Sequence, residues 1–299
     1  MTLRNALVGL LVAVSLTACG TGATTGGNGK IKVAASTNVW GSVVKAVGGD
    51  EVEVTSIIND PSGDPHSYES KPADVAAVQQ AKLVVFNGGG YDDFFAKLIQ
   101  SDDVKKIEAF PLSGLADAHK EGSEEHGEAN EHVWYDLPSV KKVADQAAQD
   151  LAAIAPDKKA TFEANAKDFG TKIDALLERV QMLKHGQNVM ATEPVAHYLL
   201  EAAAAHDVTP VQFSKAVEQE TDVPAAALAE ARQLVETKQI VALVNNSQTE
   251  NPVAKQLVDD AKGKGIAVVN VSETLPEGVT GYVVWMTQQV DALANALGK

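Results

Sequence analysis

The sequence predicts an α/β protein of two similar lobes, each a parallel β-sheet flanked by helices, joined by one long, rigid α-helix. Three observations support this fold class. Short apolar runs alternate with Ala-rich segments of helical spacing, which is typical of parallel sheets covered on both faces. The second half of the chain repeats the order of the first half, which indicates a duplicated unit. A long amphipathic segment separates the two halves.

The N-terminus has the pattern of an exported protein. Arg4 provides a positive charge, residues 6–16 are apolar, and small residues precede Cys19, the one cysteine of the chain. This apolar stretch is too short for a membrane-spanning helix and is typical of a secretory signal. The residues "LTAC" resemble a bacterial lipobox, which would make Cys19 the lipidated first residue of the mature protein, anchored to the outer face of the cell membrane. The alternative is an ordinary signal peptide with an incidental cysteine.

The predicted organisation follows from these signals. A flexible tether rich in Gly and Thr comes after Cys19. Seven apolar runs are expected to form strands, at residues 31–36, 51–57, 82–88, 105–110, 188–192, 240–246 and 266–271. The predicted segments are a signal peptide (1–18), the lipidated Cys19 with its tether (19–30), an N-terminal lobe (31–155), a linking helix (156–186) and a C-terminal lobe (187–299).

The linking helix is predicted from one apolar stripe. Its apolar side chains recur at spacings of four and three, from Phe162 to Leu183. Pro156 favours a helix start and Gly186 a helix stop. A helix over residues 157–184 would span roughly 40 Å at 1.5 Å per residue. The alternative, a coiled-coil partner helix, is less favoured than a helix packed along both lobes, and such a helix would oppose large hinge closure.

The charge balance limits the classes of partner. Acidic residues outnumber basic ones 40 to 25. This balance argues against nucleic acid and against an anionic membrane surface, and it is compatible with a cationic ligand.

Two histidines and two glutamates are expected to meet in the cleft between the lobes. His66 follows Asp64-Pro65, His132 opens "HVWYDLP", and Glu193 and Glu273 follow predicted strands of the second lobe. Open α/β sheets bind ligands at the carboxyl ends of their strands. Two neutral imidazoles and two carboxylates also balance the charge of one divalent cation. Three further histidines are expected on helix surfaces or in packing: His185, His197 and His206.

The same segments carry a resemblance. "DPHSYES", "HVWYDLPSVKKVA", "ATEPVAHYL" and "SETLPEGVTGY" are similar, in order, to the metal-binding solute-binding lipoproteins of zinc and manganese ABC importers. That family takes one ligand from each segment, which implies that His66, His132, Glu193 and Glu273 bind one divalent metal ion. The resemblance also implies a permease and its ATPase as partners, and a monomeric, non-catalytic receptor.

The family pattern also bears on the identity of the metal. The fourth ligand is usually Asp in the family, so Glu273 is longer by one methylene group. The third ligand is His in many zinc-type members and Glu in many manganese-type members. Glutamates that bind through both oxygens would suit manganese, so Glu193 favours manganese as cargo. Zinc is nevertheless expected to bind more tightly in vitro.

Residues 117–131 form an acidic, low-complexity segment with His119 and His126. It resembles a shortened form of the His-rich loop of zinc-type members, or it is a plain mobile linker. Deleting residues 118–130 is therefore expected to leave the affinity of the main site nearly intact.

Two other functions remain open. A metallohydrolase would need an open coordination position and a nearby general base, and four protein ligands would fill a tetrahedral zinc site. An adhesin or interaction lipoprotein is possible as a second role. Related receptors for siderophores or cobalamin need a wide cleft, whereas four short side chains suit a bare ion.

Overall fold

The computed structural model describes residues 29–61, 63–115, 130–249 and 251–298. The predicted signal peptide, Cys19 and nearly all of the tether lie outside the described residues, as does most of the segment 117–131. No helix in the described part of the chain is long and apolar enough to cross a membrane.

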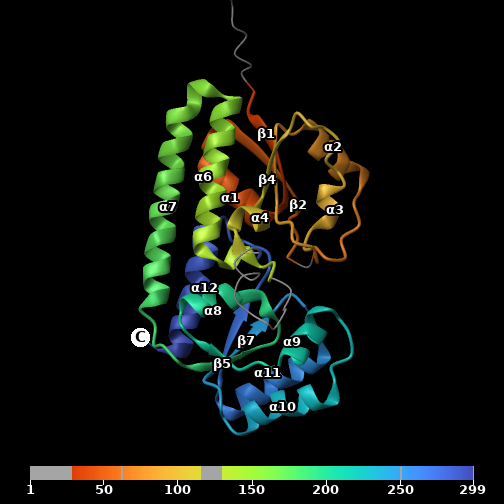
Figure 1. The fold of residues 1–299 in the computed structure, drawn as a ribbon, viewed down its shortest axis with the longest axis vertical. Coiled ribbons are helices and arrows are strands. Elements are labelled where there is room, and N and C mark those ends of the chain that lie inside the picture. Colours follow the sequence, from red (N-terminus) through yellow and green to blue (C-terminus); the bar gives the residue numbers. More distant parts are fainter. Residues whose placement is uncertain (1–28, 62, 116–129, 250, 299) are drawn as a thin grey trace, which may run out of the picture.

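The described chain forms two lobes, one above the other, each built on a four-stranded parallel sheet (Figure 1). The first sheet has the order β2-β1-β3-β4, and the second has the order β6-β5-β7-β8. The two orders are the same when each half is counted from its own first strand, as expected for a duplicated unit. The strands are β1 (Ile31–Thr37), β2 (Val52–Ile58), β3 (Leu83–Phe86), β4 (Lys105–Glu108), β5 (Asn188–Ala191), β6 (His206–Asp207), β7 (Ala242–Asn246) and β8 (Ala267–Val271).

Helices cover the sheets, and the central strands are therefore buried on both faces. All four residues of β3 are buried, which explains why the sequence shows a continuous apolar run there. The helices of the first lobe are α1 (Asn38–Gly48), α2 (Pro72–Gln80), α3 (Asp93–Ala96), α4 (Ala109–Ser113) and α6 (Leu137–Ile154). Those of the second lobe are α8 (His197–Ala202), α9 (Val211–Glu218), α10 (Ala225–Glu236), α11 (Pro252–Lys264) and α12 (Tyr282–Leu297).

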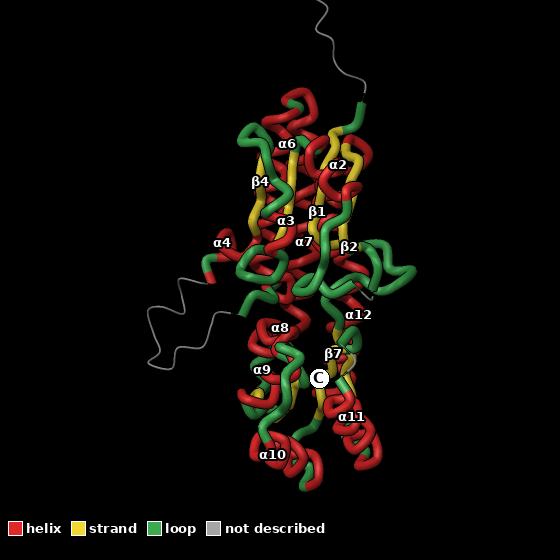
Figure 2. The backbone as a smooth tube through the Cα atoms, turned by 90° about the vertical axis from the view of Figure 1, so that its right-hand side faces the viewer, coloured by secondary structure: helices red, strands yellow, loops and turns green. Residues whose placement is uncertain are grey.

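The predicted long helix is confirmed as α7 (Lys159–Gln181), which runs beside α6 along the first lobe and ends at the second lobe (Figures 1 and 2). A short 3-10 helix, Pro156–Lys158, precedes it. The apolar stripe is buried, including Phe162, Phe169 and Ile173. α7 contacts α1 and α6 of the first lobe and α8 and α12 of the second. One helix therefore packs against both lobes.

The lobes also share one hydrophobic core. A single cluster of buried side chains runs from Val33 in β1 to Leu297 in α12. Buried hydrogen bonds cross the junction as well: the Tyr282 hydroxyl donates to the Trp134 carbonyl at 2.6 Å, and the Tyr135 hydroxyl donates to the Ser272 carbonyl at 2.9 Å. Closing or opening the lobes as rigid bodies would break these bonds and expose the core.

His206 differs from the sequence-based expectation. It begins the edge strand β6 and is exposed, rather than lying on a helix or in packing. A strand of two residues is too short to show alternation in the sequence, so no pattern could predict it. His185 is exposed in the turn after α7, and His197 begins α8, with its Nε2 3.4 Å from Glu201.

Candidate metal centre

His66 lies in the loop after β2, on a backbone held by its neighbours. Pro65 is buried, and the carboxylate of Asp64 accepts the backbone N–H of His66 at 2.9 Å and the Ser67 hydroxyl at 2.6 Å. This short-range pattern fixes the turn, because an Asp side chain here replaces a backbone acceptor. The His66 side chain is 35% exposed, and its ring packs edge-on against Tyr91 at 5.0 Å.

Tyr91 is placed by a tight turn after β3. Gly88, Gly89 and Gly90 all have positive φ, a conformation that glycine adopts without strain. The buried carboxylate of Asp92 accepts the backbone N–H groups of Asn87 and Gly88 at 2.7 and 2.8 Å. The buried Tyr91, which follows this turn, contacts both histidines, with its ring 5.0 Å from that of His66 and 6.1 Å from that of His132.

His132 is buried, with 1% of its surface exposed. It does not follow a strand directly, because α4 and the segment after it intervene; it precedes a 3-10 helix, Val133–Tyr135. Its Nδ1 lies 2.7 Å from Oδ1 of Asn130, which also accepts the backbone N–H of His132 at 2.9 Å. Asn130 Nδ2 donates to the Pro194 carbonyl at 2.8 Å, so its oxygen faces His132. Nδ1 therefore carries the proton, and Nε2 is left with a lone pair.

The two glutamates come from the second lobe. Glu193 follows β5 and Glu273 follows β8, and both are buried, with 4% and 8% of their surfaces exposed. Asn246, at the end of β7, donates from one amide nitrogen to Glu193 Oε2 at 2.9 Å and to Glu273 Oε1 at 2.8 Å. The other oxygen of Glu273, Oε2, is buried without a hydrogen-bond partner.

The pKa values of the cleft residues are shifted mainly by burial. Burial raises the pKa of Glu193 to about 7. Burial, followed by the charge of Glu193, raises the pKa of Glu273 to about 7. Burial, followed by the nearby imidazole of His66, lowers the pKa of His132 to about 3. A divalent cation would offset the raised pKa values of the two glutamates, because it favours ionised carboxylates. It also requires a neutral imidazole, which the low pKa of His132 already provides. The orphaned oxygen and this donor set fit a metal ion.

Two acidic residues that were not predicted also face this space. Glu218, at the end of α9, has its Oε1 4.0 Å from His132 Nε2, and that oxygen has no hydrogen-bond partner. Burial, followed by the charge of Glu131, raises the pKa of Glu218 to about 8. Glu131 Oε1 lies 3.9 Å from His66 Nε2. The sequence places Glu218 inside an ordinary amphipathic helix, and only the tertiary fold brings it to His132.

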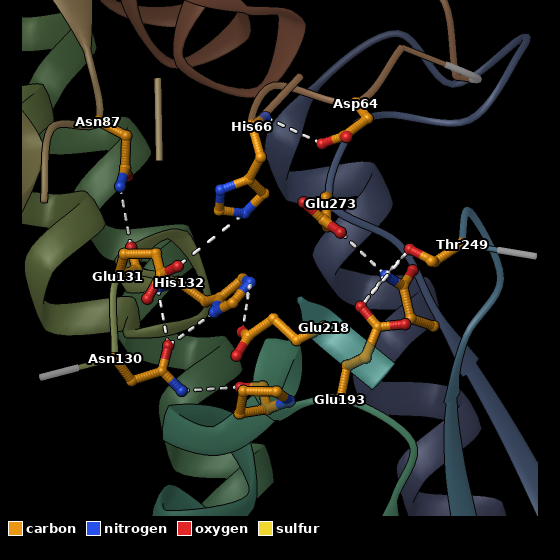
Figure 3. A network of polar contacts seen from close by, with 12 residues as sticks. Asp64, His66, Asn87, Asn130, Glu131, His132, Glu193, Glu218, Thr249 and Glu273 are labelled. Carbon is orange, nitrogen blue, oxygen red and sulfur yellow. Dashed lines mark hydrogen bonds and ion pairs between the residues drawn. The ribbon is translucent and has the colours of Figure 1, made fainter. Parts of the chain in front are cut away.

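The structure brings the four predicted ligands to one space between the lobes, with the histidines and the glutamates on different sides (Figure 3). Their ligand atoms are not all within 4.8 Å of one another. In the described part of the chain, the one set of three His or acidic side chains that meets this distance is Glu131, His132 and Glu218. This set is an alternative to the predicted four.

Comparison with known proteins decides the family. Residues 33–296 match the family model described as ZnuA, zinc-uptake complex component A, periplasmic. The chain belongs to the ZnuA family. It is 28% identical, over 99% of both chains, to the manganese ABC transporter substrate-binding lipoprotein PsaA of Streptococcus anginosus. It is also 28% identical to the iron ABC transporter substrate-binding lipoprotein MtsA of Streptococcus pyogenes, over 73% of this chain and 76% of the relative.

A solved structure confirms the fold of this ZnuA-family chain. The periplasmic zinc-binding protein TroA of Treponema pallidum superposes with a TM-score of 0.73, covering 91% of this chain and 100% of TroA at 19% identity. Both the family and the fold agree with the sequence-based resemblance. They also agree with a substrate-binding component of an importer rather than an enzyme.

Proposed function

We propose that this protein is the extracytoplasmic receptor of a metal-importing ABC transporter. It captures one divalent transition metal ion in the cleft between its lobes and passes it to a membrane permease, whose ATPase drives import. The observation that supports this function best is the convergence of two imidazoles and two buried carboxylates, one of which has an orphaned oxygen, in a chain of the ZnuA family. A lipid anchor at Cys19 would hold the receptor near the permease.

We propose His66, His132, Glu193 and Glu273 as the ligands of the ion. His132 presents an unprotonated Nε2, and Asn246 leaves one oxygen of each glutamate free of its own hydrogen bonds. His66 is the least buried of the four and is the ligand that can meet an ion arriving from solvent. Two ionised glutamates and two neutral histidines would give a neutral filled site, which reduces the penalty of burying the ion.

The cargo is proposed as Mn²⁺ or Zn²⁺. Relatives are named for manganese, iron and zinc, so their names do not choose among these ions. Affinity alone cannot choose either, because zinc binds more tightly than manganese at almost any nitrogen and oxygen site. Growth of a strain lacking this protein in metal-depleted medium decides the question, since the ion that restores growth only when the protein is present is the cargo.

The ligand set is tested by calorimetry on the mature chain after removal of metal with a chelator. Replacing any of the four proposed ligands by alanine is expected to weaken zinc binding by more than about 100-fold, the upper effect of losing only an outer contact, since each change removes a direct bond to the ion. His185→Ala and Glu230→Ala are matched controls, because both residues are exposed and lie in other parts of the fold. Near-unchanged binding in His66→Ala or Glu193→Ala would overturn the proposed set. A Glu218→Ala loss as large as that of Glu193→Ala would favour the set of Glu131, His132 and Glu218.

A further inference from the structure

Asn246 occupies a position between the two cleft glutamates that neither charge nor sequence pattern marks. It is the last residue of β7 and is 3% exposed. Its amide nitrogen lies 2.9 Å from Oε2 of Glu193 and 2.8 Å from Oε1 of Glu273, and it also lies 3.0 Å from the Thr249 hydroxyl. One neutral side chain therefore holds two buried carboxylates in fixed orientations.

The orientation of the Asn246 amide is itself fixed. Its oxygen accepts the backbone N–H of Gln248 at 3.1 Å, and its backbone N–H donates to the Thr192 hydroxyl at 3.0 Å. Turning the amide over would place its oxygen against two carboxylates and its NH₂ against a backbone donor. Both of the resulting contacts are unfavourable, so the nitrogen stays directed at the glutamates.

The hydrogen bonds use one oxygen of each carboxylate. The two contacts to Glu193, from Asn246 and from the Thr249 hydroxyl at 3.5 Å, both fall on Oε2. The Asn246 contact to Glu273 falls on Oε1, and Oε2 of Glu273 is buried without a partner. Each glutamate therefore has one oxygen that Asn246 does not contact, and on the other oxygen the Asn246 hydrogen bond competes with a cation for the lone pairs. The Tyr91 hydroxyl also acts on Glu273 and opposes the burial that raises the pKa of that carboxyl.

We propose that Asn246 is a positioning residue that limits each glutamate to one metal-binding oxygen and so favours zinc over manganese. This inference rests on the proposed ligand set. Two single oxygens and two imidazole nitrogens give four donor atoms, the number that zinc prefers. Manganese prefers six, mostly oxygen, donors, and two glutamates that each chelated through both oxygens would supply them with the histidines. Asn246 thus opposes the sequence-based expectation that Glu193 favours manganese.

The test compares Asn246→Ala and Asn246→Leu with the unchanged chain. Asn245→Ala is the matched control, because Asn245 is the preceding residue of the same strand and pairs with Asn270 instead of the glutamates. Zinc and manganese affinities are measured by competition with a chelator. The visible absorption of bound Co²⁺ reports coordination number, since four-coordinate Co²⁺ absorbs strongly and six-coordinate Co²⁺ weakly. Thermal unfolding of the metal-free variants verifies that they fold, and the leucine variant preserves side-chain volume if alanine does not fold.

The unchanged chain and Asn245→Ala are expected to give the intense Co²⁺ spectrum. Both Asn246 variants are expected to give a weaker spectrum. They are also expected to lower the ratio of zinc to manganese affinity about tenfold, which corresponds to the free energy of one hydrogen bond to a charged group. A folded Asn246 variant that retains the spectrum and the ratio of the unchanged chain would overturn this inference. Failure of the unchanged chain to bind metal at all would instead overturn the proposed function.

Discussion

Oδ1 of Asn130 and Nδ1 of His132 lie 2.7 Å apart, and this contact determines which ring nitrogen of His132 faces the cleft. Asn130 is itself bound to the second lobe by two hydrogen bonds. Its side-chain amide donates to the Pro194 carbonyl, and its backbone carbonyl accepts the Tyr198 hydroxyl at 2.6 Å. A histidine of the first lobe is therefore oriented by the second. Such supporting contacts are a general feature of metal-binding histidines.

Asn130→Ala is expected to weaken zinc affinity about 10- to 100-fold, the usual effect of losing an outer contact to a metal-binding histidine. The imidazole would lose its fixed tautomer and orientation, although it would remain present. Chelator competition measures the change. Asn188→Ala is the control, because Asn188 is a half-buried asparagine whose amide bonds only peripheral groups. Equal affinity in both variants would show that His132 does not need this contact.

Two deletions, one that retains Asn130 and one that removes it, separate the role of Asn130 from that of the acidic segment. Removing residues 118–129 is expected to leave zinc affinity nearly unchanged, whereas removing residues 118–130 should weaken it as Asn130→Ala does. The sequence-based expectation is that deleting residues 118–130 leaves the affinity of the main site nearly intact. We now expect this only for residues 118–129, because Asn130 contacts His132. A large loss in the shorter deletion would mean that residues 118–129 supply a ligand.

Metal binding at pH 7 is expected to release protons. The pKa of Glu193 and of Glu273 is about 7 without metal, and that of Glu218 is about 8, so all three bind protons at neutral pH. A cation requires ionised carboxylates, and affinity should therefore rise from pH 6 to pH 8. Calorimetry in two buffers of different ionisation enthalpy counts the protons. Glu218→Gln should release fewer of them; equal heats in the two buffers would contradict the prediction.

Glu193 is expected to make the metal-free protein less stable as the pH rises from about 4.5 through about 7. Burial raises the pKa of Glu193 from 4.5 to about 7, so the folded state binds more protons than the unfolded state and rising pH favours unfolding. His132 acts at lower pH: its pKa falls from 6.5 to about 3, and its contribution is lost as the pH drops below 6.5. Urea unfolding at several pH values measures both effects.

The matched variants for this pH dependence are Glu193→Gln and Glu230→Gln. The first removes a buried titrating carboxylate and should reduce the loss of stability between about pH 4.5 and 7. The second alters an exposed residue and should leave the profile unchanged. Saturating zinc should abolish the loss in the unchanged chain, because a bound cation keeps the carboxylates ionised in the folded state. A profile that Glu193→Gln does not alter would contradict the assigned cause.

Tyr282→Phe is expected to lower the free energy of unfolding by about 1–3 kcal/mol, the penalty of leaving a buried carbonyl without its donor. The Tyr282 hydroxyl is buried at the junction of the lobes and donates to the Trp134 carbonyl at 2.6 Å. Urea unfolding measures the change. Tyr68→Phe is the comparison, because Tyr68 is only partly buried and its partner Asp74 also accepts the backbone N–H of Lys71. Equal losses in the free energy of unfolding would show that the hydrogen bond at the junction of the lobes stabilises the protein no more than the one at Tyr68.

The sequence by itself determined the fold class and the four candidate ligands. The strands and α7 could be predicted because their apolar residues recur with a local period, which is visible in residues close together in the sequence. The candidate ligands could be chosen because His66, His132, Glu193 and Glu273 stand in segments with a distinctive order. Asp64 and Pro65 restrict the backbone before His66, and in the structure the Asp64 carboxylate accepts the backbone N–H of His66.

Tertiary structure decided what surrounds those four residues. Asn130, Glu218 and Asn246 have no local signal, since a buried amide and an amphipathic-helix carboxylate look ordinary in sequence. Their roles arise because strands and helices far apart in the chain meet at the junction of the lobes: Asn246 is 53 residues from Glu193 and 27 from Glu273. Hydrogen-bond geometry between such residues depends on packing to a fraction of an ångström. Residue periodicity carries no information at that scale, so the orientation of each ligand was decided only by the fold.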